Sequence, residues 1–298
     1  MDGSFWTNTI WFIALGATSV AALVVIFVKT PERKKTFAFW FAVLGLTYWM
    51  EVMLVLILNA YTYQPMIVQD PFFDAVLGNI FSQVSVSSSA VLICVFALSN
   101  GWLLGFSVAY FLVDLLFSAL GVYVHNWYQS VYTLAGFLIY GGIVKYWYKK
   151  IFDSPSKKIF YPTLFLSAFA VSANLHGTVL RLLDIRIFHS AIFADPSRDH
   201  TATSLIYQSI IILISIALHK SKARWTLKAL VFLLILIGQY GLIQAGVIVV
   251  KPGWWLFVML FDLLGFYGWT VLMDRSLRSE SGRYYPNIFR KRSPFQRS

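Results

Sequence analysis

Three acidic side chains lie inside long apolar stretches of this sequence: Glu51, Asp114 and Asp262. A carboxylate near the middle of a lipid bilayer costs about 2.5–3.5 kcal/mol on insertion scales, so each is expected to face the protein interior, to be paired or to be protonated. These acids are therefore the first candidates for a polar site at membrane depth that serves a solute, an ion or a proton.

Asp114 has the most suggestive neighbours. Ser107, Tyr110, Asp114 and Ser118 recur at spacings of three, four and four residues, which places them on one face of a helix. We expect Asp114 to face the bundle interior beside Tyr110 and Ser118. Polar side chains of this kind also hold helices together, at about 0.6 kcal/mol each on average, so a functional and a structural role both stay open.

His176 and Arg181 complete the candidate set. The structural alternative for His176 is a hydrogen-bonded core residue. For Arg181 it is an ion pair with Asp184, three residues further along the same helix. The sequence contains a single cysteine, Cys94, and no HExxH, CxxC or Walker A pattern, so no catalytic, cofactor-binding or metal-binding residue is predicted.

The composition indicates which elements must position these groups. Apolar residues make up 58% of the chain, charged residues 12%, and the mean hydropathy is +0.69, whereas an ordinary soluble domain is roughly a quarter charged. Stretches of about 20 apolar residues are long enough to cross a bilayer. We predict an all-α, polytopic transmembrane helix bundle with about nine spans, eight or ten being the alternatives. The predicted spans cover residues 5–28, 37–58, 78–98, 102–122, 130–148, 159–182, 203–218, 227–250 and 254–273.

Basic residues predict the orientation of the bundle. Of the 24 Lys and Arg residues, all but Arg181, Arg186, Arg198 and Lys251 fall in alternate loops, at the adjoining helix ends or in the C-terminal tail. The positive-inside rule then places the N-terminus outside and the C-terminus in the cytoplasm. The net charge of +11 is thus interpreted as a sign of orientation and not of nucleic-acid binding.

Two regions follow from these spans: residues 1–274 as the transmembrane helical bundle and residues 275–298 as a basic cytoplasmic tail. The tail intersperses Arg and Lys with aromatic residues. Basic residues next to an anionic membrane surface contribute about 1 kcal/mol each. We therefore expect the lipid bilayer as the main partner and anionic inner-leaflet lipids as partners of the tail.

The stretch from Asp70 through Thr133 contains a serine-rich segment, DPFFDAVLGNIFSQVSVSSSAVLICVFALSN, and then LGVYVHNWYQSVYT. It resembles a group of uncharacterised multi-pass membrane proteins from Bacillus-like endospore-forming bacteria. The resemblance covers about a fifth of the chain and implies a bacterial plasma membrane, but no activity.

The leading functional hypothesis is transport or permeation of a small polar solute or proton across the plasma membrane. The alternative is a non-catalytic membrane sensor or assembly subunit, and a membrane-embedded lipid-modifying enzyme is the third option. The first two spans and the seventh and eighth also share an outline, with Glu51 and Gln244 at similar offsets. Transporters often contain such repeats, but any two helical hairpins that obey the positive-inside rule share the same outline, so both explanations stay open.

Overall fold

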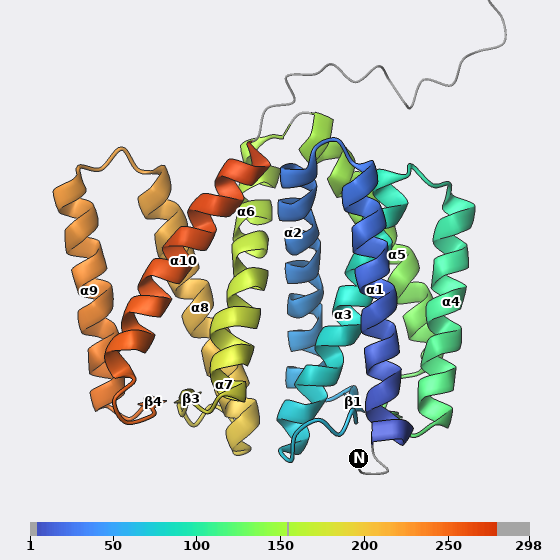
Figure 1. The fold of residues 1–298 in the computed structure, drawn as a ribbon, viewed down its shortest axis with the longest axis horizontal. Coiled ribbons are helices and arrows are strands. Elements are labelled where there is room, and N and C mark those ends of the chain that lie inside the picture. Colours follow the sequence, from blue (N-terminus) through green and yellow to red (C-terminus); the bar gives the residue numbers. More distant parts are fainter. Residues whose placement is uncertain (1–4, 154, 279–298) are drawn as a thin grey trace, which may run out of the picture.

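The chain folds as a bundle of long helices that run roughly parallel or antiparallel to one another (Figure 1). The computed structural model describes residues 5–153 and 155–278. The long helices there are α1 Ile10–Lys29, α2 Arg33–Glu51, α3 Pro71–Val95, α4 Asn100–Ala119, α5 Ser130–Asp153, α6 Lys157–Ser172, α8 Pro196–Lys220, α9 Trp225–Gln244 and α10 Trp255–Leu277. This confirms the predicted all-α bundle.

Three of these helices contain a π-helical segment, and α6 also has a short continuation. The segment Phe5–Thr9 precedes α1, Val52–Ile57 follows α2, and Ala173–Val179 follows α6 and leads into α7 Leu180–Leu182. Four short strands form two antiparallel pairs. They are β1 Tyr61–Tyr63 with β2 Tyr123–His125, and β3 Arg186–Phe188 with β4 Ile248–Val250.

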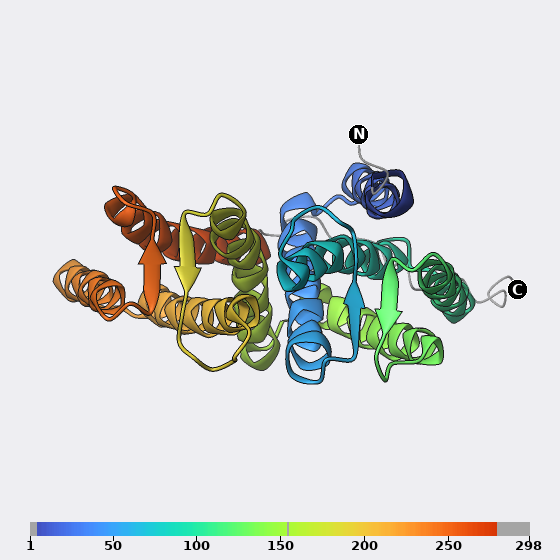
Figure 2. The ribbon, with the colours of Figure 1, turned by 90° about the horizontal axis from the view of Figure 1, so that it is seen from below.

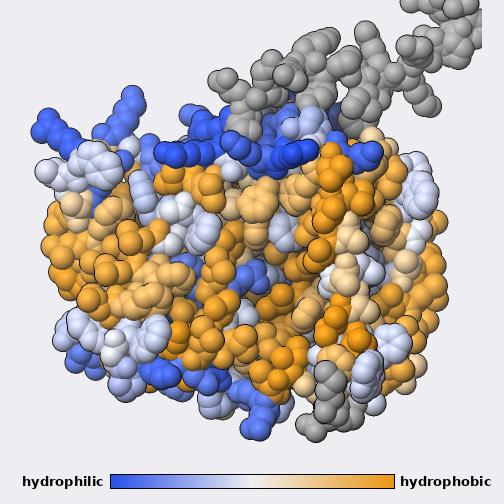
Figure 3. All heavy atoms as spheres, in the orientation of Figure 1, coloured by the Kyte–Doolittle hydropathy of each residue, from blue (hydrophilic) through white to orange (hydrophobic). Residues whose placement is uncertain are grey.

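Eight helices in the described residues are long and apolar enough to cross a membrane. The helix α5 is not among them, although it has 24 residues and lies alongside α4 (Figure 1). On the face shown in Figure 3, an apolar belt lies between two more polar ends of the bundle. The connections after α1, α3, α5 and α8 and the end of α10 share one end of the bundle, as the charge pattern predicts, and the strands lie at the other (Figure 1).

The bundle consists of two units of the same design. Five elements of the second unit begin 125 residues after their counterparts: Tyr61 to Arg186, Pro71 to Pro196, Asn100 to Trp225, Tyr123 to Ile248 and Ser130 to Trp255. The first unit thus contains α2 to α5, the second contains α6 to α10, and α1 precedes both. Viewed from the strand end, the units are related by an approximate half-turn, with α2 and α6 adjacent at the centre (Figure 2).

The turns repeat along with the helices. Gly121 and Gly246 both have positive φ, and in each case the following N–H donates to the carbonyl five residues before it, which satisfies the carbonyls at the helix end. Asn59 and Asp184, which also have positive φ, repeat at the same distance. The repeat predicted from the first two spans and the seventh and eighth is therefore wrong, because the equivalent helices are α2 to α5 and α6 to α10.

A shared D-P-x-x-D motif explains where the third and seventh spans begin. Asp70 and Asp195 cap α3 and α8 by accepting the N–H of Phe73 and Arg198, and a proline follows each cap. The second acid of each motif, Asp74 or Asp199, accepts several N–H groups of the preceding loop. These spans begin at residues 71 and 196, seven residues before the predicted starts at 78 and 203. The predicted eighth span is too long, since it ends with α9 at Gln244 and β4 follows.

The units meet closely along α2 and α6. A Cβ on Gly45 would lie 2.3 Å from the backbone oxygen of Leu166, so only glycine permits this approach. At the strand end, Asp70 also accepts a hydrogen bond from Ser197 of α8 and pairs with Arg181 at 3.4 Å. Burial alone would raise the pKa of Asp70, but the hydrogen bonds from Ser197 and Phe73 and the charge of Arg181 outweigh it, and the pKa is lowered.

Candidate functional site

Glu51 lies at the last residue of α2, where the π-helical segment Val52–Ile57 begins. A π-helical turn inside an α-helix often marks a functional site, because the inserted residue redirects the side chains around it. The hydroxyl of Tyr61 donates to the carboxylate of Glu51 at 2.7 Å, and the amide of Asn79 donates to it at 3.1 Å. The side chain is therefore held in place by neutral donors.

Asp114 is held in a similar way by neutral donors from the next helix. The hydroxyls of Ser130 and Thr133 on α5 each donate to one oxygen of Asp114, both at 2.5 Å. His125, from β2, places its Nε2 3.2 Å from the same carboxylate. The prediction that Asp114 faces the interior agrees with its burial.

The two acids line one cavity of about 310 Å³ in the first unit. Its other lining side chains are mostly aromatic or aliphatic, and neither Lys nor Arg is among them. The tyrosines that line it are Tyr61, Tyr63, Tyr110, Tyr123, Tyr128, Tyr132 and Tyr140. The cavity thus combines two carboxylates with aromatic faces, and its lining contains no Lys or Arg, although the imidazole of His125 lies behind Asp114.

Tyrosines from the strands and the loop before α5 cover the strand end of this cavity. The rings of Tyr63 and Tyr123 are stacked with centroids 4.6 Å apart, and Tyr61 packs edge-on against Tyr123. Burial raises the pKa of Tyr128 to about 12 and raises the pKa of Tyr61, Tyr63 and Tyr123 as well. These phenols therefore stay neutral at physiological pH and offer hydroxyl groups and ring faces.

Two of the side chains that line the cavity are also exposed at the surface of the bundle. They are Met50 of α2 and Tyr132 of α5, which are 40% and 44% exposed.

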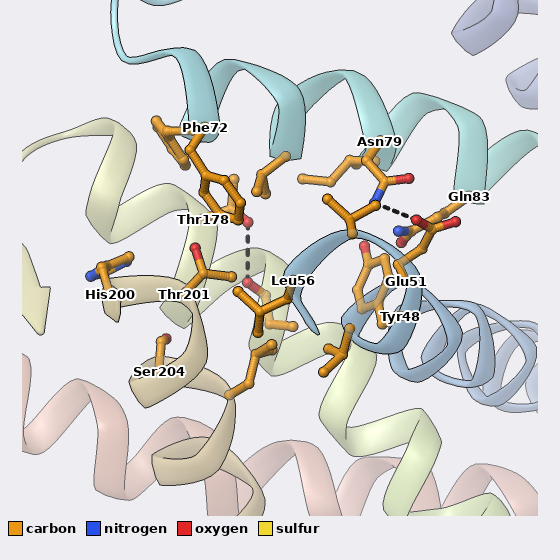
Figure 4. Close-up of a pocket in the computed structure, with 18 of the residues that line it drawn as sticks. Tyr48, Glu51, Leu56, Phe72, Asn79, Gln83, Thr178, His200, Thr201 and Ser204 are labelled. Atoms are coloured by element: carbon orange, nitrogen blue, oxygen red, sulfur yellow. Dashed lines mark hydrogen bonds between the residues drawn. The ribbon is translucent and has the colours of Figure 1, made fainter. Parts of the chain in front are cut away.

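A second, smaller cavity of about 110 Å³ lies between the two units and also reaches Glu51. Asn79 and Gln83 from α3 border it on one side, and Thr178, His200, Thr201 and Ser204 border it from the second unit (Figure 4). Glu51 therefore forms part of the wall of both cavities.

The equivalent region of the second unit is filled. His176 occupies the place of Glu51, Arg186 that of Tyr61 and Gln239 that of Asp114, each 125 residues further along the chain. Arg186 and Asp262 are completely buried and form an ion pair, and Tyr207 donates to the same carboxylate at 3.0 Å. The second unit thus neutralises its buried acid with its own arginine.

His176 belongs to this closed network. Its Nδ1 lies 3.0 Å from Asp262, and its Nε2 accepts the indole N–H of Trp269 at 3.3 Å. A ring that accepts at Nε2 carries its proton on Nδ1, so His176 is neutral and donates to Asp262. The structural alternative for His176, a hydrogen-bonded core residue, is confirmed.

The structure places the seven predicted site residues in four different regions. Asp114, Glu51 and Tyr110 line one cavity. Asp262 and His176 lie together in the second unit, Ser118 is exposed, and Arg181 lies at the strand end, 3.0 Å from Asp184. The prediction that Ser118 faces the interior beside Asp114 is wrong, because α4 turns that position away from its neighbours.

Sequence reasoning missed the tyrosine lining and the burial of Arg186, which was assigned to an external loop. The signal for Arg186 was Asp262, since a buried acid in a membrane span needs a partner. Within residues 5–153 and 155–278 no three His, Cys, Asp or Glu side chains are grouped so that they could hold a metal ion. No protein-family model, curated protein or solved structure matches the chain.

Proposed function

We propose that this protein binds a small organic solute with a positively charged group in the cavity of the first unit and moves it across the membrane. The observation that supports the proposal is the shared cavity of Glu51 and Asp114, which has two carboxylates and no basic lining residue. In our proposal the membrane is the plasma membrane.

The charge of the solute follows from electrostatics. Two carboxylates in one membrane-embedded cavity repel each other and are costly to keep ionised, unless a positive charge or protons balance them. Aromatic ring faces also attract cations, by about 0.5–2 kcal/mol for each well-placed ring. A cationic solute would satisfy both requirements, whereas an anion would meet two negative charges.

The division between the units supports the same function. The second unit pairs its acid internally and buries both partners, so in our proposal it serves as a fixed partner against which the first unit packs. The partly exposed lining residues Met50 and Tyr132 would suit an amphiphilic solute that reaches the site through the bilayer.

Binding and uptake of a series of quaternary ammonium compounds test the proposal. Purified protein should bind these cations better than neutral molecules of the same shape, as measured by tryptophan fluorescence or calorimetry. Asp114→Asn should weaken binding by about tenfold or more, because each lost tenfold corresponds to about 1.4 kcal/mol. Asp184→Asn is the matched control, since Asp184 is an exposed acid outside the cavity.

Three outcomes distinguish transport from sensing and from neither function. Uptake into proteoliposomes that Asp114→Asn abolishes supports transport. Binding without uptake favours the alternative, a membrane sensor. Equal affinity for cations and their neutral analogues would contradict both, since the two carboxylates would then not recognise charge.

A further inference from the structure

Three buried carboxamide side chains whose oxygens lack hydrogen-bond partners line the small cavity between the units. Asn79, Gln83 and Gln208 border it, and all three are more than nine-tenths buried. The side-chain oxygen of each makes no hydrogen bond. A buried acceptor without a partner costs about 1–3 kcal/mol, so three of them around one cavity require an explanation.

One contact fixes the orientation of Asn79. Its nitrogen donates to the Glu51 carboxylate at 3.1 Å, which cannot be reversed because the carboxylate only accepts. Gln208 directs its nitrogen to the hydroxyl of Ser204 at 2.8 Å. Gln83 and Gln208 occupy equivalent positions of the two units, so the cavity is lined by equivalent residues from both.

The charge on the lining of the cavity is negative. Glu51 is the only charged side chain among the lining residues. His200 accepts the N–H of Phe188 at its Nδ1, so its ring carries no positive charge in this arrangement. A ligand for this cavity must therefore offer positive charge to one carboxylate and to neutral oxygens.

We propose that this cavity binds one monovalent inorganic cation, of the Na⁺ type, through Glu51 and the oxygens of Asn79, Gln83 and Gln208. Alkali and alkaline-earth cations are hard ions that prefer carboxylate, amide and water oxygens. A volume of about 110 Å³ is too small for a large organic solute and suits an ion with a few waters. The single charge of Glu51 matches a monovalent ion.

The shared carboxylate links this cation to the solute, a step that rests on the proposed function. Glu51 faces both cavities and carries one negative charge. A cation bound between the units therefore weakens the electrostatic attraction of this carboxylate for a cationic solute. Sodium ions therefore weaken binding of the solute, and the solute weakens binding of sodium by the same factor. Such mutual exclusion is the property required for exchange of one for the other.

Thermal unfolding of the purified full-length protein during a NaCl titration tests the site without any solute. Wild-type protein should be stabilised along a saturable curve, since a ligand that binds only the folded state raises the melting temperature. Gln83→Met and Gln208→Met should each lose the saturable part. Gln83→Glu keeps an oxygen, adds charge and should respond at lower NaCl concentration.

Two control variants make the result specific. Gln239→Met removes a buried glutamine whose oxygen is also unpaired but which lies outside the cavity, so it should keep the sodium response. Asp114→Asn should also keep it while losing the solute, which separates a failure of the proposed function from a failure of this inference. Equal responses of wild type and Gln83→Met, or no response of either, would show that the oxygens bind water only and would overturn the proposal.

Discussion

The buried ion pair of the second unit predicts that Asp262 supports the fold and not solute binding. Its carboxylate receives Arg186, His176 and Tyr207 and is 1% exposed. Asp262→Asn keeps the shape of the side chain but removes the carboxylate that pairs with Arg186. The guanidinium then remains buried in the bundle without a counter-charge.

The magnitude follows from that isolated charge. Removal of one partner of a buried ion pair costs about 3–5 kcal/mol, because the remaining charge loses compensation that no solvent replaces. Replacement of both partners by neutral groups is often close to neutral. We therefore expect Asp262→Asn to lower the unfolding free energy by about 3–5 kcal/mol and the double variant Asp262→Asn, Arg186→Gln to recover most of that loss.

Unfolding in mixed detergent, followed by tryptophan fluorescence, measures both variants against wild type. Asp114→Asn provides the contrast: in the described part of the chain Asp114 is held by two hydroxyl donors and His125 and has no Arg or Lys partner, so its loss should cost about 1 kcal/mol. If Asp262→Asn is as stable as wild type, or if the double variant is less stable than Asp262→Asn alone, the assignment of this pair to stability is refuted.

Three further predictions concern the helix ends, the contact between units and the orientation. Asp70→Ala should lower stability by about 1–2 kcal/mol at neutral pH, more than Asp195→Ala, because Asp70 also pairs with Arg181 and accepts from Ser197. Since the pKa of Asp70 is lowered in the fold, its ionic contribution is present above the unfolded value of about 4 and disappears as the pH falls through the lowered pKa, which unfolding at several pH values measures. Gly45→Ala should cost about 1–3 kcal/mol by forcing α2 from α6, whereas Gly238→Ala, which has open space, should be neutral or stabilising in the same assay. A reporter active only outside the cell should stay silent when fused after Ser298, and activity there would contradict the predicted cytoplasmic C-terminus.

Sequence patterns were sufficient to predict the helices and the end of the bundle at which each connection lies. Long apolar stretches and basic loops report directly on a membrane environment. They were insufficient for the start of α3 and α8, where the cap Asp70 or Asp195 begins the helix in a polar stretch. They also missed the strands, which are only three residues long. The repeat stayed hidden because its equivalent positions share few residue types beyond the D-P-x-x-D motif.

The candidate site could be predicted only in part. Glu51 and Asp114 were identified singly, since a carboxylate in an apolar stretch is visible in one sequence. Their meeting in one cavity depends on how α2, α3, α4 and α5 pack, which no spacing within one helix reveals. The tail, with its predicted lipid contacts, lies outside the described residues from 279 onward.

The half-turn that relates the two units limits which movements could open a binding site first to one side of the membrane and then to the other. Each unit contains four long helices, so both units begin at the same end of the bundle and their axis runs along the membrane normal. Transporters with inverted repeats can interchange inward-open and outward-open states by letting two halves swap conformations, but parallel repeats have no such symmetry. In the transport that we propose, a change of access would therefore come from rotation of one unit against the other or from movement within the first unit. Gln83 and Gln208 line the contact between the units, so a rotation centred on that contact would move them less than the outer helices. The cation that we propose between the units could then stay bound while the outer helices move.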